Sequence, residues 1–390
     1  MSNLISLTKI YIVCCFLLSS CAVPQPQKPT LTPKPEQTSS PTNTPLPPQA
    51  FPVKLAWFYK APISEDYALV ASQYDFFILS KGNEDDRNKL LALGAHRPIL
   101  EYIRFDAIMD PGSCSRDPWK NNAAFMPGDF CNISTQHPDW FLLDKNGERY
   151  VDPYGGEEFV RMDPGNPGWR AFFLERVRQT LDNDRNWDGI FMDNVEVTMY
   201  NLERESSLPT AYQDEASYQA AVQGFLSYLS LNYFKPSGRL LFANIVSRKD
   251  DANWVEYISA LDGVMHEGWS IDWPNRYRPA DVWEKQLTLA EDTQALGKYI
   301  LLISQGTQPD QELEQFAFAS YLLVNQGRAV FRYANSQNYK EIWLYDNYST
   351  DLGKALGPRF REGDAWRRNF SNGYVLVNPT THESQIKIGN

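Results

Sequence analysis

The sequence predicts an α/β fold, a (β/α)8 TIM barrel with a long loop after its third strand and a small C-terminal β appendage. Eight short apolar segments rich in Val, Ile, Leu and Phe recur from residue 53 to residue 334, and segments with helical periodicity lie between them. The runs are continuous rather than alternating, which indicates strands buried on both faces, as in a parallel sheet. A doubly wound open sheet is the alternative, but no GxGxxG motif follows the first strand.

The elements follow one another in the order that this barrel requires. The predicted strands span residues 53–59, 74–80, 97–103, 188–193, 239–245, 262–268, 299–305 and 328–334. Helices are predicted over residues 167–184, 217–234, 278–297 and 308–327, with Pro and Gly at their boundaries. We assign the barrel to residues 51–338. Residues 339–390 alternate apolar with polar positions and predict a β appendage that packs on the barrel.

The first 50 residues predict an export leader and a tether. A short apolar run after Lys9 ends in Leu18-Ser19-Ser20-Cys21, which resembles a bacterial lipobox whose Cys21 is acylated. We therefore expect residues 1–21 to be a lipoprotein signal peptide and the protein to be an extracytoplasmic lipoprotein of the cell envelope; a plain signal peptide is the alternative. Residues 22–50 hold nine prolines and five threonines, a composition typical of a disordered tether.

Charge and composition exclude several classes of partner. The formal net charge is −11, so a nucleic-acid partner is not expected, because phosphate binding needs a basic surface. An anionic polymer is disfavoured on the same ground, unless a local basic patch overrules the net charge. The four histidines are widely spaced and predict no metal site, and no motif calls for a cofactor. We expect a monomer that touches the membrane only through its lipid anchor.

The connection over residues 104–167 is too long for an ordinary loop between a strand and a helix, which indicates a functional role. It follows the third strand and is rich in aromatic residues, so we interpret it as a wall of the binding cleft; an excursion packed on the side of the barrel is the alternative. It also holds Cys114 and Cys131. In an exported protein these two cysteines are expected to form a disulfide, although two unpaired thiols remain the alternative.

Two strands end on a carboxylate. The segment WDGIFMDN carries Asp193 at the end of the fourth strand, and LDGVMHEG carries Glu267 at the end of the sixth. Active sites of these barrels lie at the C-terminal ends of the strands, so both acids should face one mouth. Cleavage of a glycosidic bond needs such a pair, one to protonate the leaving oxygen and one to attack or activate water. The structural alternative for Asp193 is a cap on the next helix.

Other polar and aromatic residues near the strand ends are candidates for binding sugar hydroxyls or rings. Glu196 is also the closest competitor of Asp193 for the catalytic role. The candidates are Tyr59, Glu101, Asn194, Glu196, Asn244, Trp269, Gln305, Arg332 and Tyr333.

Several segments resemble bacterial TIM-barrel families of hypothetical glycosyl hydrolases, of the family 15 type and related to the endo-α-1,4-polygalactosaminidases. The segments are HPDWFLLDKNGERY, RMDPGNPGWRAFFLERV, WDGIFMDNVEVT, LDGVMHEGW and RRNFSNGYVLVNPT. The resemblance implies a carbohydrate substrate, Asp193 as nucleophile or charge stabiliser, and Glu267 as general acid/base. The rival hypothesis is a cell-surface carbohydrate-binding barrel without catalytic activity, which would have no need for two acids at one mouth.

Overall fold

The computed structural model describes residues 49–199, 202, 208–246, 254–272, 275–335 and 337–389. The predicted lipobox with Cys21, and nearly all of the predicted tether, lie outside these residues. Within these ranges, no helix is both long and apolar enough to cross a membrane.

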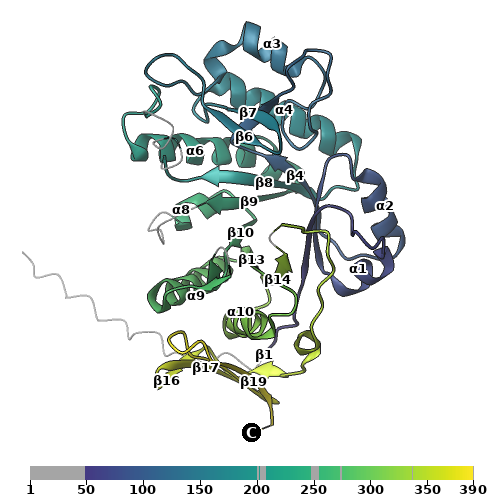
Figure 1. Cartoon of the computed structure of the whole chain (residues 1–390), viewed down its shortest axis with the longest axis vertical. Helices are drawn as coiled ribbons and strands as arrows, with labels where there is room; N and C mark the ends of the chain where they lie inside the picture. Colours follow the sequence, from purple (N-terminus) through teal and green to yellow (C-terminus); the bar gives the residue numbers. More distant parts are fainter. Residues whose placement is uncertain are drawn as a thin grey trace, which may run out of the picture. The chain divides into compact units, whose positions relative to one another are not determined.

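Eight parallel strands form the barrel, and the predicted fold class is confirmed (Figure 1). Around the sheet the order is β2–β3–β4–β8–β9–β10–β13–β14. The two edge strands approach each other through a parallel bridge between Leu55 and Phe331, and the N–H of Phe331 donates to the carbonyl of Lys54 at 2.8 Å. The strands are β2 (Ala56–Tyr59), β3 (Phe76–Ser80), β4 (Ile99–Arg104), β8 (Gly189–Glu196), β9 (Leu240–Val246), β10 (Gly263–Glu267), β13 (Tyr299–Gly306) and β14 (Ala329–Asn335).

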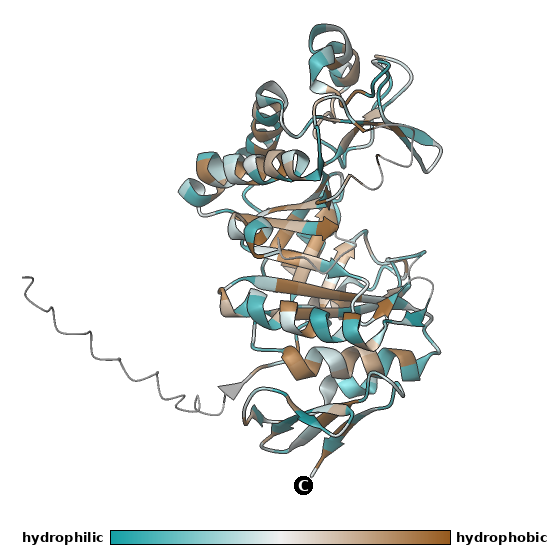
Figure 2. Cartoon of the chain, turned by 90° about the vertical axis from the view of Figure 1, so that its left-hand side faces the viewer, coloured by the Kyte–Doolittle hydropathy of each residue, from teal (hydrophilic) through white to brown (hydrophobic). Residues whose placement is uncertain are grey.

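Helices cover the outside of the barrel, and all four predicted helices are present. Figure 2 shows hydrophobic residues concentrated in the barrel strands and hydrophilic residues on many outward helix positions, the pattern of amphipathic helices on a buried sheet. The helices are α1 (Tyr67–Gln73), α2 (Glu84–Ala92), α4 (Pro167–Asn183), α6 (Glu215–Leu229) continued by η2 (Ser230–Phe234) and α7 (Lys235–Ser237), α8 (Trp254–Ser259), α9 (Ala280–Ala295) and α10 (Gln311–Val324).

Alternation along the strands separates two apolar layers. Residues facing inward fill the barrel, and those facing outward pack against the helices, so neighbours on one strand belong to different layers. In β14, for example, Val330 lies inside and Phe331 outside. The interior is filled by Ala56, Phe58, Phe76, Ile78, Leu100, Phe191, Phe242, Met265, Leu301, Ile303 and Val330.

Both carboxylate-bearing strands begin with a glycine that follows an aspartate. The glycine lets neighbouring strands approach closely, and the aspartate accepts a backbone hydrogen bond from a neighbouring strand. A Cβ added to Gly189 would lie 1.9 Å from the carbonyl oxygen of Leu240, so only glycine lets β8 and β9 come this close. The carboxylate of Asp188 accepts the N–H of Ile99 at 2.8 Å, which fastens the start of β8 to β4. Asp262 in the same way accepts an N–H from β9 at 2.9 Å.

The long excursion after β4 has secondary structure of its own. A three-stranded antiparallel sheet runs in the order β5 (Ala107–Asp110), β7 (Glu157–Arg161) and β6 (Val151–Tyr154). Helix α3 (Asp129–Gln136) and η1 (Pro138–Trp140) lie between β5 and β6 in the chain, and a disulfide joins Cys114 to Cys131. In Figure 1 the excursion lies together with α4 at the top of the view.

The C-terminal segment forms an antiparallel sheet against α10. Its strands are β15 (Lys354–Ala355), β16 (Phe360–Glu362), β17 (Ala365–Phe370), β18 (Gly373–Val377) and β19 (Ser384–Ile388), and β1 (Gln49–Ala50) pairs with β15. Buried Arg368 donates to the carbonyl of Asn325, which follows α10, at 2.7 Å, and Gln315 donates to the carbonyl of Ser384 at 2.9 Å. Residues 337–340 instead line the barrel mouth, so the sheet begins well after residue 338.

Candidate active site

Asp193 and Glu267 meet at the C-terminal end of the barrel. Each follows an inward-facing core residue by two positions, Phe191 on β8 and Met265 on β10, so alternation turns both carboxylates toward the barrel axis. Asn244, from β9 between them, donates through its Nδ2 to Asp193 Oδ1 at 3.0 Å and to Glu267 Oε2 at 3.1 Å. With one nitrogen bonded to both, these two oxygens lie at most about 6.1 Å apart.

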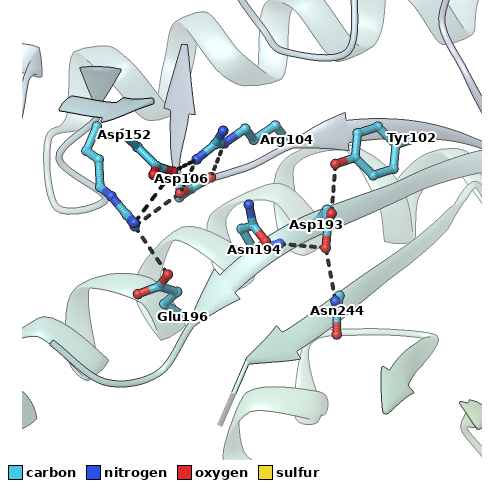
Figure 3. A network of polar contacts seen from close by, with 9 residues as sticks. Tyr102, Arg104, Asp106, Asp152, Asp193, Asn194, Glu196 and Asn244 are labelled. Carbon is cyan, nitrogen blue, oxygen red and sulfur yellow. Dashed lines mark hydrogen bonds and ion pairs between the residues drawn. The ribbon is translucent and has the colours of Figure 1, made fainter. Parts of the chain in front are cut away.

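Three donors orient the Asp193 carboxylate (Figure 3). The Tyr102 hydroxyl donates to Oδ2 at 2.7 Å, and Oδ1 accepts both Asn244 and the N–H of Asn194 at 2.9 Å. Asn194 adopts a left-handed conformation with φ of 57°, and the register between β8 and β9 shifts between Met192 and Val195. Such bulges redirect side chains at the rims of barrels, and this one sits at the acid that the strand delivers.

Three donors also contact Glu267, but its surroundings favour the protonated acid. Oε1 accepts Gln305 Nε2 at 2.9 Å and the Tyr339 hydroxyl at 3.0 Å, and Oε2 accepts Asn244. Burial raises the pKa of Glu267, and the negative charge of Asp193 raises it further, while the three hydrogen bonds lower it less. The net direction is upward, as expected for a group that has to deliver a proton near neutral pH.

The carboxylates lie in a cleft of about 720 Å³. The excursion forms one wall of it, as predicted, and contributes Trp119 and Tyr154. Tyr59 and the residues 337–340 lie along other parts of its lining. The Tyr154 side chain is 64% exposed and meets Trp119 edge to face, so aromatic surface is available to stack on sugar rings.

Residues 117–374 match the model of hypothetical glycosyl hydrolase family 15, which is more than half of the chain. The chain belongs to this family.

Among solved structures, the chain is similar to the trehalose-6-phosphate hydrolase of Bacillus licheniformis, with a TM-score of 0.50 and 10% identity over 83% of this chain and 89% of that one. The glycoside hydrolase domain of PelA from Pseudomonas aeruginosa aligns with a TM-score of 0.48 and 16% identity, over 75% of this chain and 97% of the domain. At 10% identity, the likeness to the trehalose-6-phosphate hydrolase concerns the fold alone. No curated protein matches this sequence.

Four of the predicted binding residues of this glycosyl hydrolase lie at the site. Tyr59 and Asn194 line the cleft, while Asn244 and Gln305 hold the two carboxylates. Arg332 is buried beneath the mouth, where its guanidinium donates to the carbonyls of Phe58 at 3.3 Å and of Tyr339 at 2.7 Å. Arg332 therefore positions the chain that carries Tyr339 and does not line the cleft.

Three predicted binding residues face away from the cleft, and for them the prediction is wrong. Glu101 lies between two inward residues, so alternation turns it outward, where it is buried, pairs with Lys81 at 3.7 Å and has its pKa raised by burial to about 7. Tyr333 follows inward-facing Arg332 and donates its hydroxyl to Thr307. Trp269 is fully buried and donates to the carbonyl of Ala317 in α10, so it offers no face to a sugar.

Glu196 also lies outside the cleft lining, which argues against it as the rival of Asp193. It lies beyond the bulge and accepts a hydrogen bond from Arg161 at 3.3 Å. Arg161 also pairs with Asp106, which in turn binds Arg104, and Arg104 binds Asp152 (Figure 3). This network of buried and half-buried charges ties the excursion to β4 and β8, and Arg104 and Asp152 form part of the cleft surface.

The tyrosines that hold the carboxylates, Tyr102 and Tyr339, are not among the residues predicted from the sequence. Tyr102 could have been found, because it stands two residues after inward-facing Leu100, in the C-terminal half of β4. Tyr339 had no such signal, since it follows β14 in an irregular segment. In the part of the chain that the structure describes, no group of three or more His, Cys, Asp or Glu side chains is placed to hold a metal ion.

Proposed function

We propose that this protein cleaves a poly- or oligosaccharide by a retaining mechanism, with Asp193 as nucleophile and Glu267 as general acid/base. The observation that carries the proposal is the Asn244 bridge, which keeps the bridged oxygens within about 6.1 Å. Retaining glycosidases separate their carboxyl groups by about 5 to 5.5 Å, whereas inverting enzymes need about 6.5 to 9.5 Å to admit a water molecule. The hydrogen bonds from Asn244 to both carboxylates therefore favour the shorter separation, that of retaining enzymes.

In the first step, Asp193 attacks the anomeric carbon while the bond from that carbon to the leaving oxygen breaks. The electron pair of this bond stays on the leaving oxygen, which takes the proton of Glu267. The sugar is then an ester of Asp193, and the negative charge of Asp193 is gone. Because this charge raises the pKa of Glu267, the pKa falls once the ester forms.

In the second step, Glu267 acts as a base. It removes a proton from a water molecule, whose oxygen attacks the anomeric carbon and displaces the Asp193 carboxylate. The proton is back on Glu267, and the charge is back on Asp193. Tyr102 and Asn244 hold Asp193 in line throughout, and Tyr339 and Gln305 do the same for Glu267.

The test is a screen of the purified protein on polysaccharides, including galactosamine-rich exopolysaccharides, with release of reducing ends as the measurement. Asp193→Asn and Glu267→Gln should each lower turnover by about two to four orders of magnitude at nearly unchanged melting temperature. Glu101→Gln is the matched control, because it removes another buried carboxylate with a raised pKa that faces away from the cleft. This control should keep full turnover.

The stereochemical claim is tested separately, by following the anomer first released with NMR. Retention of the anomeric configuration supports Asp193 as nucleophile. Inversion would contradict the inference from the short distance between the two carboxylates. Azide added to an inactive Asp193 variant should yield a glycosyl azide if the acid/base is intact. Saccharide binding without turnover in the unmodified protein would instead favour the inactive carbohydrate-binding barrel.

A further inference from the structure

Two lysines lie at the seam where the barrel closes. Lys60 directly follows β2, Lys340 follows β14, and both are exposed residues that line the cleft of the two catalytic acids. The main chains of the two segments are joined, because the N–H of Ile63 donates to the carbonyl of Lys340 at 3.0 Å. The indole of Trp57 also donates to the carbonyl of Lys60 at 2.8 Å. The backbone at both lysines is therefore anchored, and both residues belong to the cleft lining.

Within the described ranges, neither Lys60 nor Lys340 forms an ion pair with a carboxylate. Glu341 is the neighbouring acid in the chain, but neutral donors occupy its oxygens: Asn338 donates to Oε1 at 3.0 Å, and Asn335 and Trp343 donate to Oε2 at 3.1 and 3.0 Å. The two positive charges also repel each other. Desolvation at the cleft surface lowers the pKa of Lys60, and the positive charge of Lys340 lowers it further.

Arg104 also lines the cleft, but unlike the two lysines it forms ion pairs. Its guanidinium pairs with Asp106 at 2.8 Å and with Asp152. The lysine pair thus stands out as positive charge available for a ligand. Two like charges near each other repel, and an anion placed between them would relieve this repulsion.

We propose that Lys60 and Lys340 form a subsite for an anionic substituent of the saccharide, a carboxylate, sulfate or phosphate group. The net charge of −11 would repel such a substrate at long range, so recognition needs a local pair of cations like this one. In the ring of strands, β8 with Asp193 lies across the barrel from β2 and β14. The subsite and the nucleophile are therefore on opposite sides of the mouth, and the bound anion stays clear of the attacking carboxylate.

The inference rests on the proposed function only in taking the ligand to be a saccharide. Its test is calorimetric titration of the Glu267→Gln protein, in which turnover should be strongly reduced, with glucuronate, galacturonate, glucose 6-sulfate and glucose 6-phosphate. Glucose and galactose are the neutral references. At least one charged probe should bind about tenfold or more tightly than its neutral reference, because a hydrogen bond to a charged group strengthens binding by at least about this factor. Its affinity should fall with added salt.

Lys60→Gln and Lys340→Gln should each lower the affinity for the preferred charged probe by about tenfold and leave the neutral reference within about twofold. Lys145→Gln is the matched control, since Lys145 is exposed and outside the cleft lining, and it should change neither affinity. The preferred probe identifies which of the three anionic groups the site takes.

No binding of any charged probe, no preference over the neutral sugars, or unchanged affinity in both lysine variants would overturn the inference. The two proposals fail differently. Hydrolysis of a neutral saccharide without any effect of the lysine variants refutes the subsite and leaves the hydrolase. Lysine-dependent binding of an anionic sugar, with no hydrolysis of any saccharide, refutes the mechanism and leaves the subsite.

Discussion

Replacing Tyr339 by Phe should move the alkaline limb of the pH profile to higher pH. The hydroxyl of Tyr339 donates to Glu267 Oε1 at 3.0 Å, and this bond lowers the pKa of Glu267 against the effect of burial. In Tyr339→Phe the ionised form of Glu267 loses this hydrogen-bond donor, so the pKa of Glu267 rises. Because cleavage needs protonated Glu267, the rate falls only when the pH exceeds this higher pKa, and the active pH range widens on its alkaline side.

The strength of the lost hydrogen bond sets the size of this pKa shift. A hydrogen bond to a charged group contributes about 1.5 to 3 kcal/mol, and one pKa unit corresponds to about 1.4 kcal/mol, so a shift of about one to two units is the upper range. Gln305 donates to the same oxygen at 2.9 Å and compensates in part. We therefore expect a shift of about one unit.

The assay is kcat/KM for the substrate found in the polysaccharide screen, measured from about pH 4 to about pH 9, because this parameter reports ionisations of the free enzyme. Tyr374→Phe is the control, since the Tyr374 hydroxyl binds Gln385 in the C-terminal sheet, and its profile should match that of the unmodified protein. An alkaline limb that stays in place or moves to lower pH in Tyr339→Phe would refute Glu267 as the general acid.

Two predictions concern export. Cys21→Ser should release the protein from the membrane fraction or stall its processing, as immunoblots of cell fractions would show; a membrane-bound, normally matured variant would contradict the lipobox. The Cys114–Cys131 disulfide, with a sequence separation of 17, should appear as linked peptides in non-reduced mass spectra, and its loss should cost about 3 kcal/mol in the free energy of unfolding. Complete alkylation of both cysteines without prior reduction would disprove the bridge.

The barrel and the positions of its two acids follow from local patterns in the sequence. Continuous apolar runs mark each strand, and the eight predicted strands match the eight observed ones. A carboxylate at the end of such a run must lie at the C-terminal mouth, which is why Asp193 and Glu267 could be named in advance. The rule of alternation would also have chosen Tyr102 over Glu101, because inward-facing Leu100 sets the phase of β4.

Contacts between segments far apart in the chain determine how the residues of the site are held together. Asn244 brings the carboxylates together only because β9 lies between β8 and β10, and the bulge at Asn194 depends on how β8 pairs with β9. Tyr339 reaches Glu267 because buried Arg332 binds the main chain that carries it. The sequence alone thus determined which strands exist and what their ends carry, since alternation and strand direction are properties of short segments. Only the tertiary structure determined which side chains meet, because hydrogen bonds between residues far apart in the chain leave no periodic trace in it.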